Sequence, residues 1–137
     1  MIDDETSSRL VKLAQEARNN SYAPYSHYHV GAAVLAASGK IYTGANVENS
    51  SYGLSVCAER VAIWKAVSEG EKQILAVAVA TENGGTPCGA CRQVMSEFGS
   101  GDIPVLVADA EGLKQTFRLE DLLPEAFSGS DLVSGNE

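Results

Sequence analysis

The sequence predicts an α/β fold in which a mixed five-stranded sheet is sandwiched between helices. Two continuous apolar runs, residues 74–80 and 103–108, are typical of strands that are covered on both faces. Three segments, residues 6–20, 57–69 and 88–98, carry apolar residues at helical spacing. The expected order is helix, strand, strand, helix, strand, helix, strand, strand, which favours one sheet with helices packed on its faces.

The first helix, over residues 6–20, is predicted from apolar residues at helical spacing: Leu10, Val11, Leu13, Ala14 and Ala17. Thr6 or Ser7 can cap its start, and the polar residues 19–21 should end it. A loop stiffened by Pro24 follows and leads into the first strand.

A hairpin should follow this loop. Residues 29–37 are apolar and predict a buried strand, a turn at 38–40 reverses the chain, and residues 41–44 begin a second strand. Residues 45–56 are polar and irregular, so we expect a loop there. The second helix then runs over residues 57–69 and stops at Gly70.

The second half of the chain alternates strands and a helix. The predicted helix at 88–98 lies between the two apolar strands, after a loop at 82–86, and Gly99 ends it. The remaining expectations are a turn at 110–112, a fifth strand over 115–119, a short turn or helix at 122–124, and weak order over 128–137. Because no repeat, low-complexity tract or linker is present, we expect residues 1–137 to form a single domain.

Composition narrows the class of function. The 137 residues are 45% hydrophobic and 20% charged, as in an ordinary globular domain, and no apolar run approaches the roughly 20 residues that span a bilayer. The acidic start at residues 1–5 resembles neither a secretory signal nor a mitochondrial presequence, so we expect a cytoplasmic protein without a membrane partner. The net charge of −8 and pI of about 4.7 weigh against a nucleic-acid partner and favour a small, weakly charged substrate.

Two short motifs contain all three cysteines of the chain, Cys57-Ala58-Glu59 and Pro87-Cys88-Gly89-Ala90-Cys91. An odd number of cysteines cannot all pair in disulfides, and C-x-x-C spacing in a cytosolic chain more often binds metal or does redox work. The two motifs are close to the established zinc-deaminase signature, H-x-E followed by P-C-x-x-C, with cysteine in place of the histidine. The alternative is that the cysteines are small buried hydrophobes.

Three thiolates can hold Zn²⁺ on three sides and leave the fourth position for water, as a catalytic site requires. A closed structural site would need a fourth ligand from His27 or His29. As alternate residues entering a strand, these two should face opposite ways. We therefore favour an open site, in which zinc lowers the pKa of a bound water and Glu59 transfers protons. The alternative for Glu59 is a helix-stabilising carboxylate, because a negative charge near a helix N-terminus interacts favourably with the helix dipole.

Arginines follow both motifs directly. Cys57 and Cys88 lie where a loop becomes a helix, and a helix N-terminus stabilises a thiolate. Arg60 and Arg92 could each donate hydrogen bonds to the sulfurs and offset the charge of three thiolates around a dication. The alternative for each arginine is an ordinary surface charge.

The chain resembles the small, homotetrameric cytidine deaminases over nearly its full length. The resemblance rests on blocks that are together far more specific than one C-x-x-C: YAPYS at 22–26, VGAA at 30–33, GANVEN at 44–49, YG at 52–53, CAER at 57–60, PCGACRQ at 87–93 and LLP at 122–124. It implies hydrolytic deamination of cytidine and 2′-deoxycytidine to uridine and 2′-deoxyuridine in pyrimidine salvage, with one Zn²⁺ per chain.

The resemblance also implies residue roles. Cys57, Cys88 and Cys91 match the zinc ligands, Glu59 the proton shuttle and Arg60 the residue that offsets thiolate charge. Four further matches concern the substrate. Asn46 and Glu48 match the pair that hydrogen-bonds the ribose hydroxyls, and Tyr28 matches an aromatic, usually Phe, that packs on the pyrimidine. Backbone at Ala58 or Pro87 is the candidate contact to the base edge, and Phe127 matches an aromatic that reaches a neighbouring subunit's site.

Spacing alone supports the sugar contacts more weakly. Asn46 and Glu48 alternate at a strand end, so both can point into one pocket, and a carboxylate accepts strongly from a diol. The alternative is that Asn46 and Glu48 belong to a turn and have no contact with a substrate. By spacing alone, Tyr28 and Phe127 are more often core residues than ligand contacts.

Three other functions remain open at this stage. The first is a deaminase of a modified cytosine nucleoside such as blasticidin S, against which the GANVEN block argues because it suits a ribose. The second is a polynucleotide-editing deaminase, which the acidic balance disfavours. The third is a non-catalytic, zinc-stabilised module, in which Glu59 would have no role.

Overall fold

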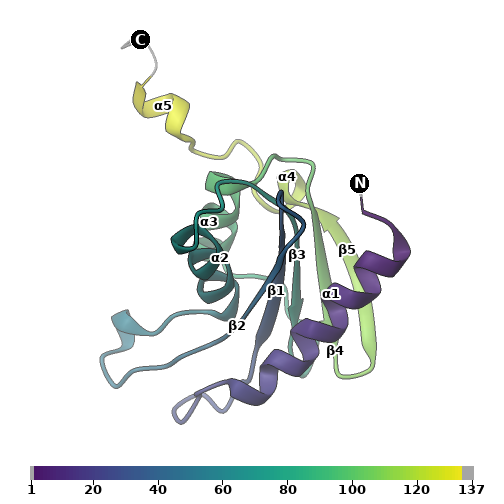
Figure 1. Ribbon diagram of the computed structural model, residues 1–137. Coiled ribbons are helices and arrows are strands. Elements are labelled where there is room, and N and C mark those ends of the chain that lie inside the picture. The colour runs from purple at the N-terminus through teal and green to yellow at the C-terminus, as the bar shows by residue number, and fades with distance from the viewer. Residues whose placement is uncertain (1, 134–137) are drawn as a thin grey trace.

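The computed structural model describes residues 2–133, which form a five-stranded mixed sheet with helices on both faces (Figure 1). The strand order is β2-β1-β3-β4-β5. The pair β3–β4 is parallel, and the pairs β1–β2, β1–β3 and β4–β5 are antiparallel. The strands are β1 (Gly31–Ala36), β2 (Ile41–Ala45), β3 (Ile74–Ala80), β4 (Pro104–Asp109) and β5 (Gly112–Arg118).

Helix α1 (Asp4–Ala17) covers one face of the sheet, and α2 (Ala58–Ser68) and α3 (Gly89–Phe98) cover the other (Figure 1). Shorter helical turns complete the fold: η1 (Arg18–Asn20), η2 (Tyr52–Leu54), α4 (Leu119–Leu122) and α5 (Gly129–Val133). The predicted sandwich of helices around a mixed five-stranded sheet is therefore confirmed.

Side chains of the central strands alternate between two cores. In β3, Val77 and Val79 pack toward α2 and α3, whereas Ala76, Ala78 and Ala80 pack toward α1. This alternation follows from the period of two in a strand, and it explains the continuous apolar run, since both faces are covered. Small alanines on the α1 side let this helix lie close to the sheet.

Several boundaries differ from the sequence prediction. Strand β3 has its predicted limits, but β5 begins at Gly112 and ends before Leu119, which starts α4. Strand β1 begins only at Gly31, because the preceding backbone bonds to the Asn46 side chain instead of extending the ladder.

The expectation of weak order over 128–137 is corrected for residues 129–133, which form α5. The Ser128 N–H donates to Asp131 Oδ2 (2.8 Å), and the Asp131 N–H donates to the Ser128 carbonyl (3.0 Å). This Ser-x-x-Asp pattern resembles a capping box and starts a helix locally. Residues 134–137 lie outside the described part of the chain. In the part described, no helix combines the length and the apolar character that crossing a bilayer requires.

Gly31 sets the distance between α1 and the sheet. A Cβ atom at this position would lie 2.0 Å from the Ala14 carbonyl oxygen and 2.6 Å from the Arg18 backbone nitrogen. Both are backbone atoms of one continuous helical segment, so they cannot move aside as a side chain would.

We predict that Gly31→Ala lowers the free energy of unfolding by about 3 kcal/mol, because the added methyl overpacks the contact between α1 and β1. Gly53→Ala is the matched control, since a Cβ there meets nothing within 4 Å. It should change stability by less than about 0.5 kcal/mol. Chemical denaturation measures both, and equal midpoints would contradict the proposed close contact.

Candidate zinc centre and active site

The candidate site lies at one edge of the sheet. The register places Gly31, the first residue of β1, opposite both Ala45 at the end of β2 and Ala80 at the end of β3. The segments before β1, after β2 and after β3 therefore meet there. Strands β2 and β3 run in the same direction because both are antiparallel to β1, so α2, which connects them, also begins at this edge. Helix α3 begins there too, since it connects β3 to the parallel strand β4.

This topology brings the three cysteines together. Cys57 is the N-cap residue of α2, Cys88 is the N-cap residue of α3, and Cys91 lies in the first turn of α3. The Cys57 and Cys88 sulfurs are 3.8 Å apart, and those of Cys88 and Cys91 are 3.6 Å apart. All three sulfurs lie within 4.8 Å of one another.

The donor set fits Zn²⁺. Tetrahedral ligation with Zn–S bonds of about 2.3 Å places the sulfurs about 3.8 Å apart, which agrees with the two distances observed. Within residues 2–133, these cysteines are the only cluster of His, Cys, Asp or Glu side chains placed to share a metal, and neither His27 nor His29 belongs to it. Three ligands leave a position for water, as in a catalytic site.

The sulfurs differ in acidity. Hydrogen bonds from the Cys91 thiol and from Arg60 lower the pKa of the Cys57 thiol to about 5. The same contact with Cys57, together with burial, raises the pKa of Cys91. The N-terminus of α2 adds a positive potential at Cys57. At Cys57 the environment therefore favours the thiolate form that a metal requires.

Arg60 contacts this thiolate directly. Its Nη2 atom lies 3.5 Å from Cys57 Sγ, and its guanidinium carbon lies 5.8 Å from the centre of the Trp64 ring. Interaction with Cys57 raises the pKa of Arg60. Its Nε atom is buried and has no hydrogen-bond partner among the described residues.

Arg92 has different contacts. Its guanidinium donates to the carbonyl oxygens of Pro87 (2.7 Å) and Leu122 (2.9 Å) and to Thr86 Oγ1 (3.1 Å). These described bonds go to oxygens, whereas the sequence left Arg92 either as a donor to the sulfurs or as an ordinary surface charge. The side chain instead ties the segment before Cys88 to the end of α4, because its position in the first turn of α3 faces that segment.

Glu59 is buried at the base of a cavity. Its side chain is 3% exposed, and desolvation raises its pKa to about 7. The cavity has a volume of about 420 Å³, and its lining includes Glu59, Cys57 and Cys88 together with Tyr28, Asn46 and Glu48. A carboxyl group with a pKa near neutrality therefore lies beside the candidate metal site, as proton transfer at neutral pH requires.

Asn46 and Glu48 hold the loop that precedes β1. Asn46 Nδ2 donates to the Tyr28 carbonyl (2.8 Å), while Asn46 Oδ1 accepts from Val30 N–H (3.0 Å) and from Ser21 Oγ (2.5 Å). Glu48 Oε1 accepts from the N–H groups of Tyr25 (3.0 Å) and Ser26 (3.1 Å), and the Ser26 hydroxyl donates to Oε2. The Ser26 hydroxyl bond is the main cause of the lowered pKa of Glu48.

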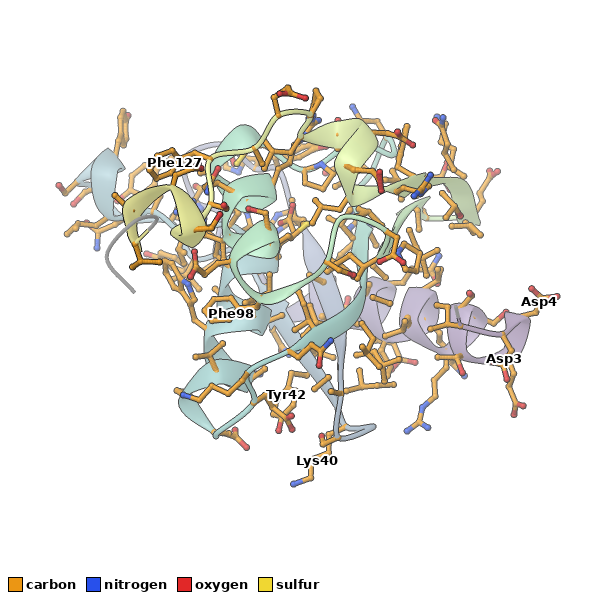
Figure 2. The ribbon with its side chains drawn as sticks, turned by 90° about the horizontal axis from the view of Figure 1, so that it is seen from above. Asp3, Asp4, Lys40, Tyr42, Phe98 and Phe127 are labelled. Carbon is orange, nitrogen blue, oxygen red and sulfur yellow. The ribbon has the colours of Figure 1, made fainter. Side chains whose placement is uncertain are left out.

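The remaining predicted site residues lie in different places. Tyr28 lines the cavity and donates its hydroxyl to Asn83 Oδ1 (2.7 Å). Ala58 is fully buried at the start of α2. Phe127 is 56% exposed and lies in the segment before α5, on the outside of the molecule (Figure 2). It does not line the cavity of its own chain, and its carbonyl accepts from Gln93 Nε2 (2.8 Å).

Several residues of the site were not singled out from the sequence. Ser21 and Ser26 orient Asn46 and Glu48, and Thr81, Gly85 and Thr86 line the cavity. Serine, threonine and glycine are common in loops, so only the position of 81–86 directly before the Pro87-Cys88 motif could have drawn attention to that segment.

We predict that Arg60→Gln raises the lowest thiol pKa of the reduced, metal-free protein by about one unit or more, because it removes a cation beside Cys57. The thiolate then appears at higher pH, which ultraviolet absorbance follows during a pH titration. Arg92→Gln is the matched control and should leave that step unchanged, since its described bonds go to oxygens. Equal shifts in both variants would contradict the direct contact between Arg60 and Cys57.

Comparison with known proteins identifies the family. The family model for the cytidine and deoxycytidylate deaminase zinc-binding region matches residues 4–107. A cytidine deaminase of Halalkalibacterium halodurans is 46% identical over 125 residues, which cover 90% of this chain and 95% of that protein. A probable cytidine deaminase of Dictyostelium discoideum is 43% identical over 139 residues, covering 99% and 93% respectively.

Solved structures agree. The crystal structure of the Burkholderia pseudomallei cytidine deaminase has a TM-score of 0.83 and 42% identity, with 92% of this chain and 100% of that chain covered. The Mycobacterium tuberculosis enzyme has a TM-score of 0.79 and 38% identity, with coverages of 92% and 98%. On this match of sequence, fold and metal-ligand cluster, the chain belongs to the zinc-binding cytidine and deoxycytidylate deaminase family.

Proposed function

We propose that the protein hydrolyses the exocyclic amine of cytidine and 2′-deoxycytidine, giving uridine or 2′-deoxyuridine and ammonia. The observation that carries this proposal is the pairing of three convergent thiols with the buried carboxyl group of Glu59 at the base of one cavity. Membership of the deaminase family supports the same reaction. The net charge of −8 also suits a small nucleoside better than a polynucleotide.

Cys57, Cys88 and Cys91 would hold one zinc ion per chain. When bound there, zinc lowers the pKa of a coordinated water and so provides a nucleophile at neutral pH. Glu59 accepts a proton as water attacks and delivers it to the departing amine, a role that suits its pKa of about 7. Arg60 offsets part of the sulfur charge, which keeps the metal a better Lewis acid.

The rest of the cavity would bind the nucleoside. Tyr28 offers a ring face to the pyrimidine, and backbone at Ala58 is the proposed contact to the base edge. Asn46 and Glu48 would bind the sugar hydroxyls. Both retain capacity for this, because Asn46 Nδ2 uses one of its two protons in the described contacts and Glu48 uses three of about four acceptor sites.

We also infer that the protein is a cytoplasmic homotetramer that serves pyrimidine salvage. In this arrangement Phe127 reaches the site of a neighbouring subunit, which agrees with its exposure and with its absence from the cavity lining of its own chain.

The direct test is the ultraviolet absorbance of cytidine mixed with zinc-replete protein. We predict that Glu59→Gln lowers kcat by about 10²–10⁴-fold, because the amide cannot transfer the proton, while metal analysis still finds about one zinc per chain. Glu69→Gln is the matched control. It removes an exposed carboxylate at the end of the same helix and should retain wild-type kcat.

Other outcomes would redirect the proposal. If wild-type protein binds zinc but leaves cytidine unchanged, the substrate is a modified cytosine nucleoside instead. If Glu59→Gln retains the wild-type rate, the proton-transfer role of Glu59 is wrong.

Subunit mixing tests the role of Phe127. We predict that Phe127→Ala lowers activity at least about tenfold, as loss of a buried aromatic contact would. Subunits carrying Phe127→Ala, mixed and reassembled with subunits carrying Glu59→Gln, should regain activity, because each intact Glu59 can then receive Phe127 from a neighbour. Activity no greater than the sum of the two separate variants, or sedimentation as a monomer, would contradict a shared site.

A further inference from the structure

The hydroxyl group of Tyr28 is engaged at the rim of the cavity. Tyr28 lines the cavity, and its hydroxyl donates to Oδ1 of Asn83 at 2.7 Å. Asn83 lies in the loop between β3 and α3, outside the cavity lining, and 55 residues separate it from Tyr28 in the chain. The bond therefore joins the segment before β1 to the segment that leads into Pro87 and Cys88.

The acceptor is itself held in place. The Thr81 hydroxyl donates to Asn83 Oδ1 (3.3 Å) and accepts from the N–H groups of Gly84 (2.8 Å) and Gly85 (2.9 Å). Thr81 is 3% exposed. Its one proton and two lone pairs are then all used, so Thr81 fixes the turn and aims the Asn83 oxygen toward Tyr28.

The other end of Tyr28 is fixed from the sugar side of the cavity. Its carbonyl accepts from Asn46 Nδ2 (2.8 Å), and its N–H donates to Ser26 Oγ (3.0 Å). Ser26 in turn donates to Glu48. Because the backbone is held by residues on the proposed sugar side and the hydroxyl by Asn83, the Tyr28 side chain lines the cavity with both of its ends anchored.

Gly85 makes room for this hydroxyl. A Cβ atom at Gly85 would lie 2.7 Å from Tyr28 Oη but 4.0 Å from Tyr28 Cζ. The first distance is a clash, and the second is an ordinary contact. An alanine at position 85 is therefore incompatible with the hydroxyl in its present place and compatible with the ring alone. Gly85 has no positive φ, so the backbone itself would accept alanine.

We propose that Asn83 is a positioning residue, which holds the Tyr28 ring in the orientation that binds the pyrimidine. This inference rests on the proposed deaminase function. Asn83 acts through the tyrosine hydroxyl, and Gly85 provides the space in which the hydrogen bond forms. The Tyr28 side chain also packs against the main core, and the hydrogen bond fixes the hydroxyl end of its ring.

The test measures KM and kcat for cytidine with zinc-replete variants. Asn83→Ala removes the acceptor, Gly85→Ala displaces the hydroxyl, and Tyr28→Phe deletes it. Each should raise KM about three- to tenfold, the worth of one hydrogen bond, with kcat within about twofold because the reacting groups are untouched. Asn83→Asp keeps the acceptor oxygen and should restore wild-type KM. Glu82→Ala, an exposed change in the same loop, is the matched control and should leave both constants unchanged.

The decisive comparison uses the Tyr28→Phe background. There Asn83→Ala and Gly85→Ala should raise KM no further, because the hydroxyl through which both act is gone. If Asn83→Ala leaves KM unchanged in the wild-type background, or if its effect persists with Tyr28→Phe, the inference is wrong.

A second readout does not depend on catalysis. The thermal midpoints of Tyr28→Phe, Asn83→Ala and the double variant should be non-additive, since both changes remove the bond between Tyr28 and Asn83. If wild-type protein fails to convert cytidine, the proposed function is wrong, and the unfolding cycle still decides the hydrogen bond: additive midpoints would overturn it. If wild-type protein is active and the changes in thermal midpoint are additive, the proposed function stands and only the positioning role of Asn83 is wrong.

Discussion

The site depends on the convergence of two helix N-termini on three sulfur atoms. Cys57 and Cys88 occupy N-cap positions but make no side-chain capping bond, so both sulfurs are free to face each other. Three thiolates at these distances would repel strongly, and the helix dipoles, the Arg60 guanidinium and a bound dication would together offset that repulsion. The sheet supplies the geometry, because β2, β3 and β4 run in the same direction and both connecting helices begin at their carboxyl ends.

The limits of elements with a strong local pattern were predictable from the sequence, whereas the limits of other elements depend on tertiary contacts such as pairing with a neighbouring strand. Strand β3 is covered on both faces, so its apolar run defines its limits. Strand β5 carries Lys114 and Gln115 on a largely exposed edge, and only hydrogen bonding to β4 extends it back to Gly112. The weak order expected after residue 128 overlooked a capping pattern, Ser128 to Asp131, that competes with the polar composition of that segment.

The same distinction between local sequence pattern and tertiary contact applies to the candidate site. The cysteine cluster was predictable because its three members occur in two short motifs with fixed spacing, and each motif starts a helix. The hydrogen-bond partners of Asn46 and Tyr28 were not predictable, since Ser21 and Asn83 lie 25 and 55 residues away from them along the chain. The sequence placed Arg60 and Arg92 in equivalent positions, and tertiary contacts distinguish them: one meets a sulfur and the other meets three oxygens.

On the proposed sugar side of the cavity, the same side chains would combine support of a loop with recognition of the substrate. Asn46 is 7% exposed and already orders the backbone on both sides of His29, and Glu48 orders the backbone at Tyr25 and Ser26. Replacing either residue would loosen the loop that carries Tyr28 as well as remove the proposed contact to the substrate. A rise in KM at Asn46 or Glu48 therefore cannot by itself be assigned to the sugar. The contact is isolated only by comparing how much the substitution raises KM for cytidine and for an analogue that lacks one sugar hydroxyl, because loss of loop support affects both substrates equally.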